Sequence, residues 1–327
     1  MRADSIDLAA ELAGPGAATQ APGTPAWLKA IDSAVIVVLN FTLALEVVLV
    51  FSNTMVRSVF NSSALMGIDE TSQPFLIAIA FLGGAVSYSH GQFIAIKVLV
   101  ERAPRSWQVF FAACVEWVVV LTALLIGGYS VPLLISNYEE STILLGIGYA
   151  WMTLPITVGS ALFVLHAGLS LGRKPLPVAL AAGLAVGAAI LLFVIARPVL
   201  GAQPALLYAV LAALFFIQVA LGVPIGFVLG VVGIACVFAV GSAKMMSVVM
   251  TAQRGSGGFI FLALPFFILA GYITDRADIG ARIVAFVASL IGHVRGGLLQ
   301  VMIVGVYISS CISGSKAADM ATIGIPM

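Results

Sequence analysis

Residues 297–320 read GLLQVMIVGVYISSCISGSKAADM, an apolar run that ends in a short polar stretch containing a glycine. As an α-helix, the 16 residues from Gly297 to Ile312 would span about 24 Å, less than the roughly 30 Å of hydrocarbon in a bilayer. A helix that stops inside a membrane must end in protein or at a water-filled cavity, because unpaired amides in lipid are costly. Gly314 permits unusual backbone angles, and Ser315 can cap a following helix. The stretch therefore predicts a re-entrant helical hairpin over 297–327.

The composition of the whole chain agrees with a membrane location for this hairpin. Of the 327 residues, 61% are hydrophobic and 9% are charged, against about 45–50% apolar and 25% charged residues in soluble domains. Several apolar runs approach the roughly 20 residues that a spanning helix needs, and they lack the alternation of barrel strands. The predicted fold is an all-α polytopic membrane protein. We expect spans at 33–52, 74–90, 109–131, 149–171, 178–196, 204–221, 224–241 and 259–275.

The distribution of positive charge predicts the orientation. Residues 1–30 lack the apolar core of a signal peptide and are expected to be a disordered cytoplasmic tail. With the N-terminus cytoplasmic and Lys316 set aside, ten Lys and Arg lie inside and four outside, in agreement with the positive-inside rule. The inside residues are Arg2, Lys29, Lys97, Arg102, Arg105, Arg173, Lys174, Arg276, Arg282 and Arg295, and the outside residues are Arg57, Arg197, Lys244 and Arg254. Two amphipathic stretches, 92–106 and 276–293, are expected as helices along the cytoplasmic surface.

Several kinds of site lack support in the sequence. The cysteines, Cys114, Cys236 and Cys311, lie in apolar runs without metal-ligand spacing, and they are interpreted as packing residues. The histidines, His90, His166 and His293, are likewise interpreted as interfacial or packing residues. Glu46 and Glu116 lie inside predicted spans, where we expect structural hydrogen bonds or subunit contacts. No ATP-binding motif is present, so direct ATP use is not expected. The formal charge of +1 carries no information about partners, and no nucleic-acid partner is expected.

Motifs in both halves of the chain resemble one transporter family. RSVFNSS (57–63), Glu70, FLGGA (81–85) and HGQFIAIKVL (90–99) resemble the small membrane subunit (DctQ) of the tripartite ATP-independent periplasmic (TRAP) transporters, and 141–171 is similar to its last span. LGVPIGFVLG (221–230), LALPFFILAGYI (262–273), IGHVRGGL (291–298) and ISGSKAADMATIG (312–324) resemble the start of the large subunit (DctM). Four such motifs in order make the second resemblance the more specific one.

The resemblance implies a natural fusion of both subunits, with 31–172 as a four-span scaffold, 173–202 as a connector helix and 203–327 as the incomplete start of an elevator-type permease. It implies a multi-pass protein of the bacterial inner membrane that imports organic acids, often carboxylates. The implied energy source is a sodium gradient, Na⁺ being a coupling ion rather than a cofactor, and the implied partner is a periplasmic substrate-binding protein. Tyr272 and Lys316 depart from the residues of many relatives. We expect no enzymatic activity.

The hairpin tip is the predicted transport site. The first helix would end in unpaired carbonyls that suit a cation, and the second would begin with free N–H groups that suit a carboxylate. Ser313, Gly314 and Ser315 are therefore candidate sodium ligands, largely through backbone oxygens. We expect Asp319 to stabilise the N-terminus of the second helix or to reach the ion, and Lys316 to attract the substrate, to pair with Asp319 or to extend through a cavity towards water. Arg57 and Glu70 are expected near the outer surface, as an ion pair or as contacts with the binding protein.

Three alternatives remain open at this point. One is an ion-coupled elevator carrier that works without a binding protein, which the four-span block before the connector disfavours. Another is an intramembrane lipid-modifying enzyme with Asp319 and His293 as acid and base, although few polar residues converge from different spans. The third is an assembly or sensory membrane protein without transport.

Overall fold

Helices make up all the extended regular structure in the part of the chain that the computed structural model describes. These residues are 25–60, 68–96, 98–142, 146–241, 244–277, 279–293 and 296–313. Within them, Ser141 and Gly148 form one isolated antiparallel bridge. The prediction of an all-α polytopic fold is confirmed.

The predicted spans coincide with observed helices. Five helices in the described ranges are long and apolar enough to cross a membrane, namely α2 (Ala26–Phe60), α3 (Ile68–Ser89), α5 (Arg105–Ser136), α6 (Ala150–Gly172) and α7 (Leu176–Ala202). The helices α8 (Pro204–Ala220) and α9 (Ile225–Val240) are apolar but shorter. Because α9 begins directly after Pro224, this proline starts a helix, where its missing N–H costs nothing.

The chain folds into two compact units. The first contains residues 25–46 and 68–257, and the second contains 47–60 and 258–313, so that α2 contributes to both. The predicted division of the chain at 172 and 202 stays a prediction. In the structure, α8 and α9 belong to the first unit together with α3, α5, α6 and α7.

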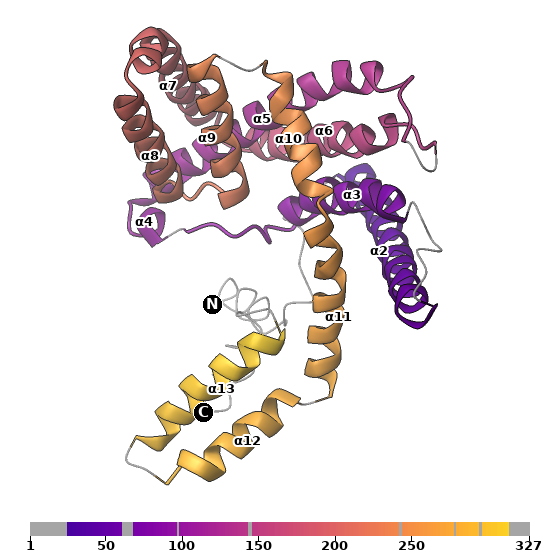
Figure 1. Ribbon diagram of the computed structural model, residues 1–327. Helices are drawn as coiled ribbons and strands as arrows, with labels where there is room; N and C mark the ends of the chain where they lie inside the picture. Colours follow the sequence, from indigo (N-terminus) through magenta and orange to yellow (C-terminus); the bar gives the residue numbers. More distant parts are fainter. Residues whose placement is uncertain are drawn as a thin grey trace. The chain divides into compact units, whose positions relative to one another are not determined.

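The first unit is built around α5, which packs against α6, α7 and α9 (Figure 1). Its largest core cluster joins Ala85 of α3, Val119 of α5 and Phe163 of α6 to Phe227 and Val228 of α9. A close approach of α3 and α6 depends on Gly159, where a Cβ would lie 2.8 Å from that of Phe81. The start of α9 is therefore an integral part of the core of this unit.

Two segments differ from the predictions. The surface helix expected over 92–106 is reduced to α4 (Val98–Glu101), and residues 92–96 are not helical. Instead, the Ile225 N–H donates to the carbonyl of Ile94 at 3.2 Å, so the non-helical segment provides a hydrogen-bond partner for the start of α9. A second difference is the helix α10 (Met246–Ser256), which lies outside all of the predicted spans.

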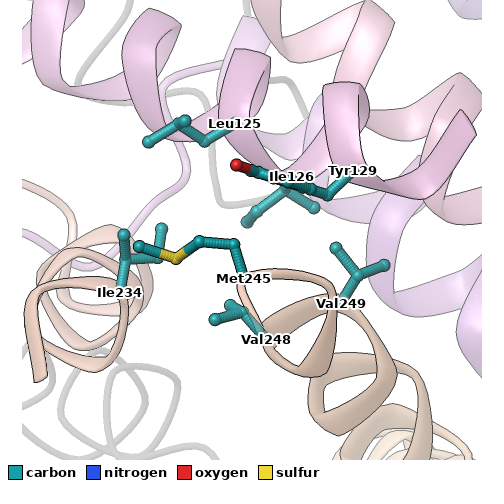
Figure 2. Close-up of a pocket in the computed structure, with 7 residues that line it drawn as sticks. All are labelled: Leu125, Ile126, Tyr129, Ile234, Met245, Val248 and Val249. Carbon is teal, nitrogen blue, oxygen red and sulfur yellow. The ribbon is translucent and has the colours of Figure 1, made fainter. Parts of the chain in front are cut away.

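The helix α10 packs tightly into the first unit. Val249 is 1% exposed and lies in a cluster with Ile77, Leu133 and Ile156. Figure 2 shows α10 facing α5 and α9, with the Met245 side chain lying toward Ile234. The void among these apolar side chains is about 10 Å³, at the lower limit for holding one water molecule. This contact is closely packed, and it is no ligand pocket.

The second unit contains η1 (Phe259–Leu262), α11 (Ala263–Arg276), α12 (Ile279–Ile291) and α13 (Gly297–Ser313). Figure 1 shows α12 and α13 side by side as a helical pair, and α13 also contacts α11. The helix expected within 276–293 is confirmed as α12. Pro265 lies in the first turn of α11, where proline is compatible with a helix.

Candidate functional site

The structure describes the first arm of the predicted hairpin. The helix α13 has 17 residues and ends at Ser313, a length of about 26 Å that falls short of the hydrocarbon thickness. Gly314, Ser315, Lys316 and Asp319 lie outside the described residues. The sodium and substrate roles assigned to this tip therefore stay predictions.

The two residues predicted near the outer surface are found on different helices. Arg57 is exposed in the last turn of α2, in the second unit, and Glu70 is half-buried near the start of α3, in the first. Glu70 takes part in a polar or electrostatic interaction. An ion pair between these residues, or a role in binding a partner, stays a prediction.

A buried acid–histidine pair joins α2 to α6. His166 Nε2 lies 3.0 Å from Asp32 Oδ1, and the two side chains are 4% and 2% exposed. His166 Nδ1 lies 2.7 Å from the carbonyl oxygen of Leu162, and since that oxygen can only accept, Nδ1 donates. Ser89 of α3 donates to the Val86 carbonyl at 2.8 Å and lies 3.3 Å from Asp32 Oδ2. Three helices are thus held by one polar cluster.

A second cluster surrounds Glu116 of α5. Its carboxylate accepts hydrogen bonds from the hydroxyls of Tyr88 on α3 and Ser170 on α6, and Lys174 Nζ lies 3.8 Å from Oε1. Lys174 is in the short turn before α7. Burial lowers the pKa of this lysine, and the neighbouring Glu116 carboxylate acts in the opposite direction. The structural hydrogen-bonding role expected for Glu116 is confirmed.

Glu46 has a different environment. It is fully buried and, within the described part of the chain, neither of its oxygens nor the buried Ser72 hydroxyl has a hydrogen-bond partner. A buried carboxyl group without partners is costly, so this position is the least satisfied polar site of α2. No group of three His, Cys, Asp or Glu residues that could hold a metal ion occurs in the described ranges.

Both polar clusters border a cavity of about 480 Å³. Its lining includes Ser89 and His90 at the end of α3, Glu116 of α5, and His166 and Arg173 at the end of α6. His90 Nδ1 lies 2.8 Å from the Val86 carbonyl oxygen. The turn between α8 and α9 closes one side of the cavity with Gly222 and Pro224.

A polar contact at the opposite ends of α5 and α6 attaches α10. Asn137 donates to the Thr153 hydroxyl at 3.2 Å, and Thr153 donates to Gln253 of α10 at 3.5 Å. Nearby, the hydroxyls of Ser130 and Thr157 lie 2.8 Å apart. Together with Val249, these contacts connect α10 to the helices of the first 174 residues.

Most of these partners were not predicted from the sequence. Asp32 was placed just before the first span, although α2 begins at Ala26, and His166 was interpreted only as a packing histidine. The sequence does contain a signal for the burial of Asp32, because Leu28, Asp32 and Val35 lie on the same face of a helix. Cys114 is buried in one apolar cluster, and Cys236 packs against a different one that includes Leu200 and Ala239, as expected of packing residues.

Comparison with protein families gives two matches in the order that the motifs predict. Residues 46–174 match the family described as tripartite ATP-independent periplasmic transporters, DctQ component, and residues 212–327 match the DctM component. The second match takes in Gly314, Ser315, Lys316 and Asp319.

Individual relatives agree with both matches. The isethionate TRAP transporter permease protein DctMQ of Oleidesulfovibrio alaskensis is 25% identical over 80% of this chain and 41% of its own length. The 2,3-diketo-L-gulonate TRAP transporter large permease protein YiaN of Escherichia coli is 35% identical over 33% of this chain and 26% of its own length. The sialic acid TRAP transporter large permease protein SiaM of Vibrio cholerae is 36% identical over 32% of this chain and 24% of its own length.

The chain thus spans about a quarter of the large permeases that it matches. These relatives are permeases rather than enzymes, so the expectation of a non-enzymatic protein is confirmed by its family. With its long apolar helices, the chain is a multi-pass membrane protein of the TRAP transporter family, in which a DctQ-like region precedes a DctM-like region.

Proposed function

We propose that this chain is the permease part of a secondary transporter that imports a small organic acid with a sodium gradient, receiving it from a periplasmic substrate-binding protein. One observation carries the proposal: a region that matches the DctQ component of a TRAP transporter is followed, in the same chain, by a region that matches the DctM component. The DctQ-like region favours this function over a carrier without a binding protein.

The relatives support the substrate class. They are named for isethionate, 2,3-diketo-L-gulonate, sialic acid and C4-dicarboxylates, all of which are anionic at neutral pH. A helix N-terminus inside the membrane attracts such an anion. We assign this role to the helix expected after Ser315, with Lys316 and Asp319 near its start.

The proposed sodium site is the tip of the hairpin. Ser313 ends α13, the first arm, and Ser313, Gly314 and Ser315 would contribute oxygens to Na⁺. Movement of this tip across the membrane by an elevator mechanism would carry ion and substrate together. The residues that complete the site would come from a second hairpin of the DctM component.

The orientation follows from charge. Arg102, Arg105, Arg173 and Lys174 lie at or near the helix ends that border the cavity, so we assign this end of the first unit to the cytoplasm of the bacterial inner membrane. The N-terminus is then cytoplasmic.

Sodium dependence of uptake by Ser315→Ala tests the site. In proteoliposomes with the full permease, its binding protein and radiolabelled substrate, we expect this variant to need several-fold more Na⁺ for half-maximal uptake. Ser289→Ala is the matched control, because Ser289 is exposed on α12 and bonds only to the nearby Phe286 carbonyl within the described residues. An unchanged sodium requirement in Ser315→Ala, Ser313→Ala and the double variant would remove the hydroxyls of both serines from the sodium site.

A further inference from the structure

Glu46 is a buried acid to which the proposed transport site gives no role. It lies in the interior of α2, far from both helix ends, and it is 0% exposed. Neither of its carboxyl oxygens has a hydrogen-bond partner within the described residues. Because nearly all buried polar groups in proteins are hydrogen-bonded, an exception of this kind needs an explanation.

The helix α2 is attached to the first unit along one narrow face. Its buried side chains include Leu28, Asp32, Thr42 and Glu46, and their spacing places all four on the same side of an α-helix. Phe41, next to Thr42, is 70% exposed. Glu46 therefore belongs to the small set of groups that hold α2 against its neighbours, and a change in its charge changes that contact.

Glu116 shows which partners a carboxylate inside this bundle can have. Two hydroxyl groups donate to its oxygens, and Lys174 Nζ lies 3.8 Å from Oε1. The Glu46 carboxyl group is faced by the hydroxyl of Ser72 on α3. Ser72 is 1% exposed and, like Glu46, has no hydrogen-bond partner in the described part of the chain. Among the described residues, Glu46 thus lacks the donors and the cation that stabilise a charged carboxylate.

Basic residues on the helices around this position do not offset a negative charge on Glu46. Arg57 lies about three turns further along α2, and Arg254 is on α10, which packs on α3; both are exposed. His166 of α6, which also packs on α3, has its own acid partner. Glu70 of α3 is a second acid rather than a counter-charge. A buried carboxylate without a compensating cation is strongly unfavourable, so a charged Glu46 does not suit this position.

A proton removes this charge with the groups that are present. A metal ion would need more ligands than one carboxyl group and one hydroxyl, and no group of three His, Cys, Asp or Glu residues that could hold one occurs in the described ranges. A protonated carboxyl group has one O–H donor, which the Ser72 hydroxyl can accept. Protonation therefore removes the charge and gives both unsatisfied groups a partner.

We propose that Glu46 is a proton-binding site, in which the carboxyl group holds a proton in the folded chain and donates it to the Ser72 hydroxyl. The neutral pair attaches α2 to α3. Release of the proton would leave an uncompensated charge between the two helices and weaken their contact, so this contact is sensitive to pH. The proposal does not depend on the transported substrate or on sodium coupling.

Infrared spectroscopy of the purified protein tests the protonation state. The carbonyl stretch of a protonated carboxyl group is separate from the bands of a carboxylate. At neutral pH, we expect such an acid band in the unchanged protein and in Glu139→Gln, which changes an exposed acid, and its loss in Glu46→Gln. An acid band that is absent at neutral pH, or that persists unchanged in Glu46→Gln, would overturn the proposal.

The stability of the same variants in detergent tests the consequence for folding. A glutamic acid in the unfolded chain is ionised at neutral and higher pH, whereas the folded chain would retain the proton, so stability should fall as the pH rises. Per pH unit, the unfolding equilibrium constant of the unchanged protein should increase by up to about tenfold more than that of Glu46→Gln. Glu139→Gln should follow the unchanged protein.

Two outcomes of this comparison count against the site. Parallel profiles for the unchanged protein and Glu46→Gln would show that no proton is held at Glu46. Glutamine has the shape of the protonated acid, so failure of Glu46→Gln to fold would mean that the position requires a charge.

Ser72→Ala identifies the acceptor of the proton. In this variant the Glu46 proton loses its hydrogen bond, so the acid band should move to a higher frequency. An unchanged band would overturn the assignment of Ser72. Replacement of sodium by choline in the buffer should affect the unchanged protein and Glu46→Gln equally, and a stabilisation by sodium that is lost in Glu46→Gln would identify a cation site in place of the proton.

Discussion

Asp32 and His166 show how far apart in sequence the partners of a membrane polar cluster can lie. They are separated by 134 positions, yet their side chains are 3.0 Å apart. Each residue is unremarkable in its own helix, and only the packing of α2 on α6 brings them together. Sequence patterns locate helices and their faces, but they do not say which faces meet.

We predict a positive coupling between Asp32 and His166 in stability. Asp32→Ala and His166→Ala should each lower the free energy of unfolding, and the double variant should cost less than the sum by about 0.5–3 kcal/mol. The physical reason is that either single change leaves the other polar group buried without its partner. The measurement is unfolding in detergent of the single and double variants.

His293→Ala is the control for this cycle. His293 is exposed and belongs to the second unit. The changes in the free energy of unfolding caused by His293→Ala and Asp32→Ala should therefore be additive. Strict additivity of Asp32→Ala with His166→Ala would contradict the paired geometry.

The buried Lys174 gives a prediction for pH. Burial lowers its pKa in the folded chain below the ordinary 10.5, so between these two values the unfolded chain binds more protons than the folded one. Stability should therefore rise as the pH increases through this window, and it should be lost as the pH falls through the folded-state pKa. In Lys174→Met this contribution should disappear.

The unfolding temperatures of the unchanged protein and of Lys174→Met are measured in phospholipid-free detergent as the pH is raised from neutral towards 10.5. This gives one profile of stability against pH for each protein. Because other lysines and tyrosines titrate in the same range, the quantity of interest is the difference between the two profiles. Parallel profiles for both proteins would show that Lys174 is not buried as described.

Among the elements, long apolar helices were predictable and short polar ones were not. Spans such as 109–131 and 149–171 coincide with α5 and α6 because about 20 apolar residues suffice to identify a spanning helix. The helix α10 contains Thr251, Gln253 and Arg254 and so lacks that signal. In the structure, Val249 and Gln253 of this helix make tertiary contacts, which no local pattern contains.

The error at 92–106 has a related cause. The alternation of apolar and cationic residues suggested an amphipathic helix, but residues 92–96 are non-helical and Ile94 bonds to the start of α9 instead. The residue that bonds to Ile94 lies 131 positions away in the sequence, so the local pattern of residues 92–96 does not contain this contact. The hairpin tip at 314–327 remains a prediction from helix length and from the serine and glycine residues.

The helix α7 is fixed to α5 by a close contact that can be tested. The Trp117 indole N–H donates to the Ala179 carbonyl at 2.9 Å, and a Cβ at Gly183 would lie 2.9 Å from the Trp117 ring. Gly183→Leu should therefore destabilise the protein by about 1–3 kcal/mol through overpacking. Thermal unfolding in detergent measures the effect.

Gly187 offers a matched control one turn further along α7. It is exposed, and a Cβ there meets no atom within 4 Å. Gly187→Leu should leave the unfolding temperature unchanged or slightly raised, since glycine is a poor helix former. Equal destabilisation by both substitutions would mean that α7 does not pack on α5 through Gly183.

In the molecule as a whole, the first helices of the DctM-like region pack together with the DctQ-like region. Phe227 and Val249, in α9 and α10, lie in core clusters with residues of the DctQ-like region, whereas α11, α12 and α13 belong to the second unit. This division is compatible with a fixed scaffold that extends to Gly257.

Uptake of radiolabelled organic acid by proteoliposomes tests the proposed import that is driven by sodium and depends on a binding protein. The full permease is reconstituted, and the sodium gradient and the cognate periplasmic binding protein are each supplied or withheld, in all four combinations. We expect accumulation only when both are present, because the ion supplies the energy and the binding protein delivers the substrate. Accumulation that is indifferent to sodium and to the binding protein would contradict it.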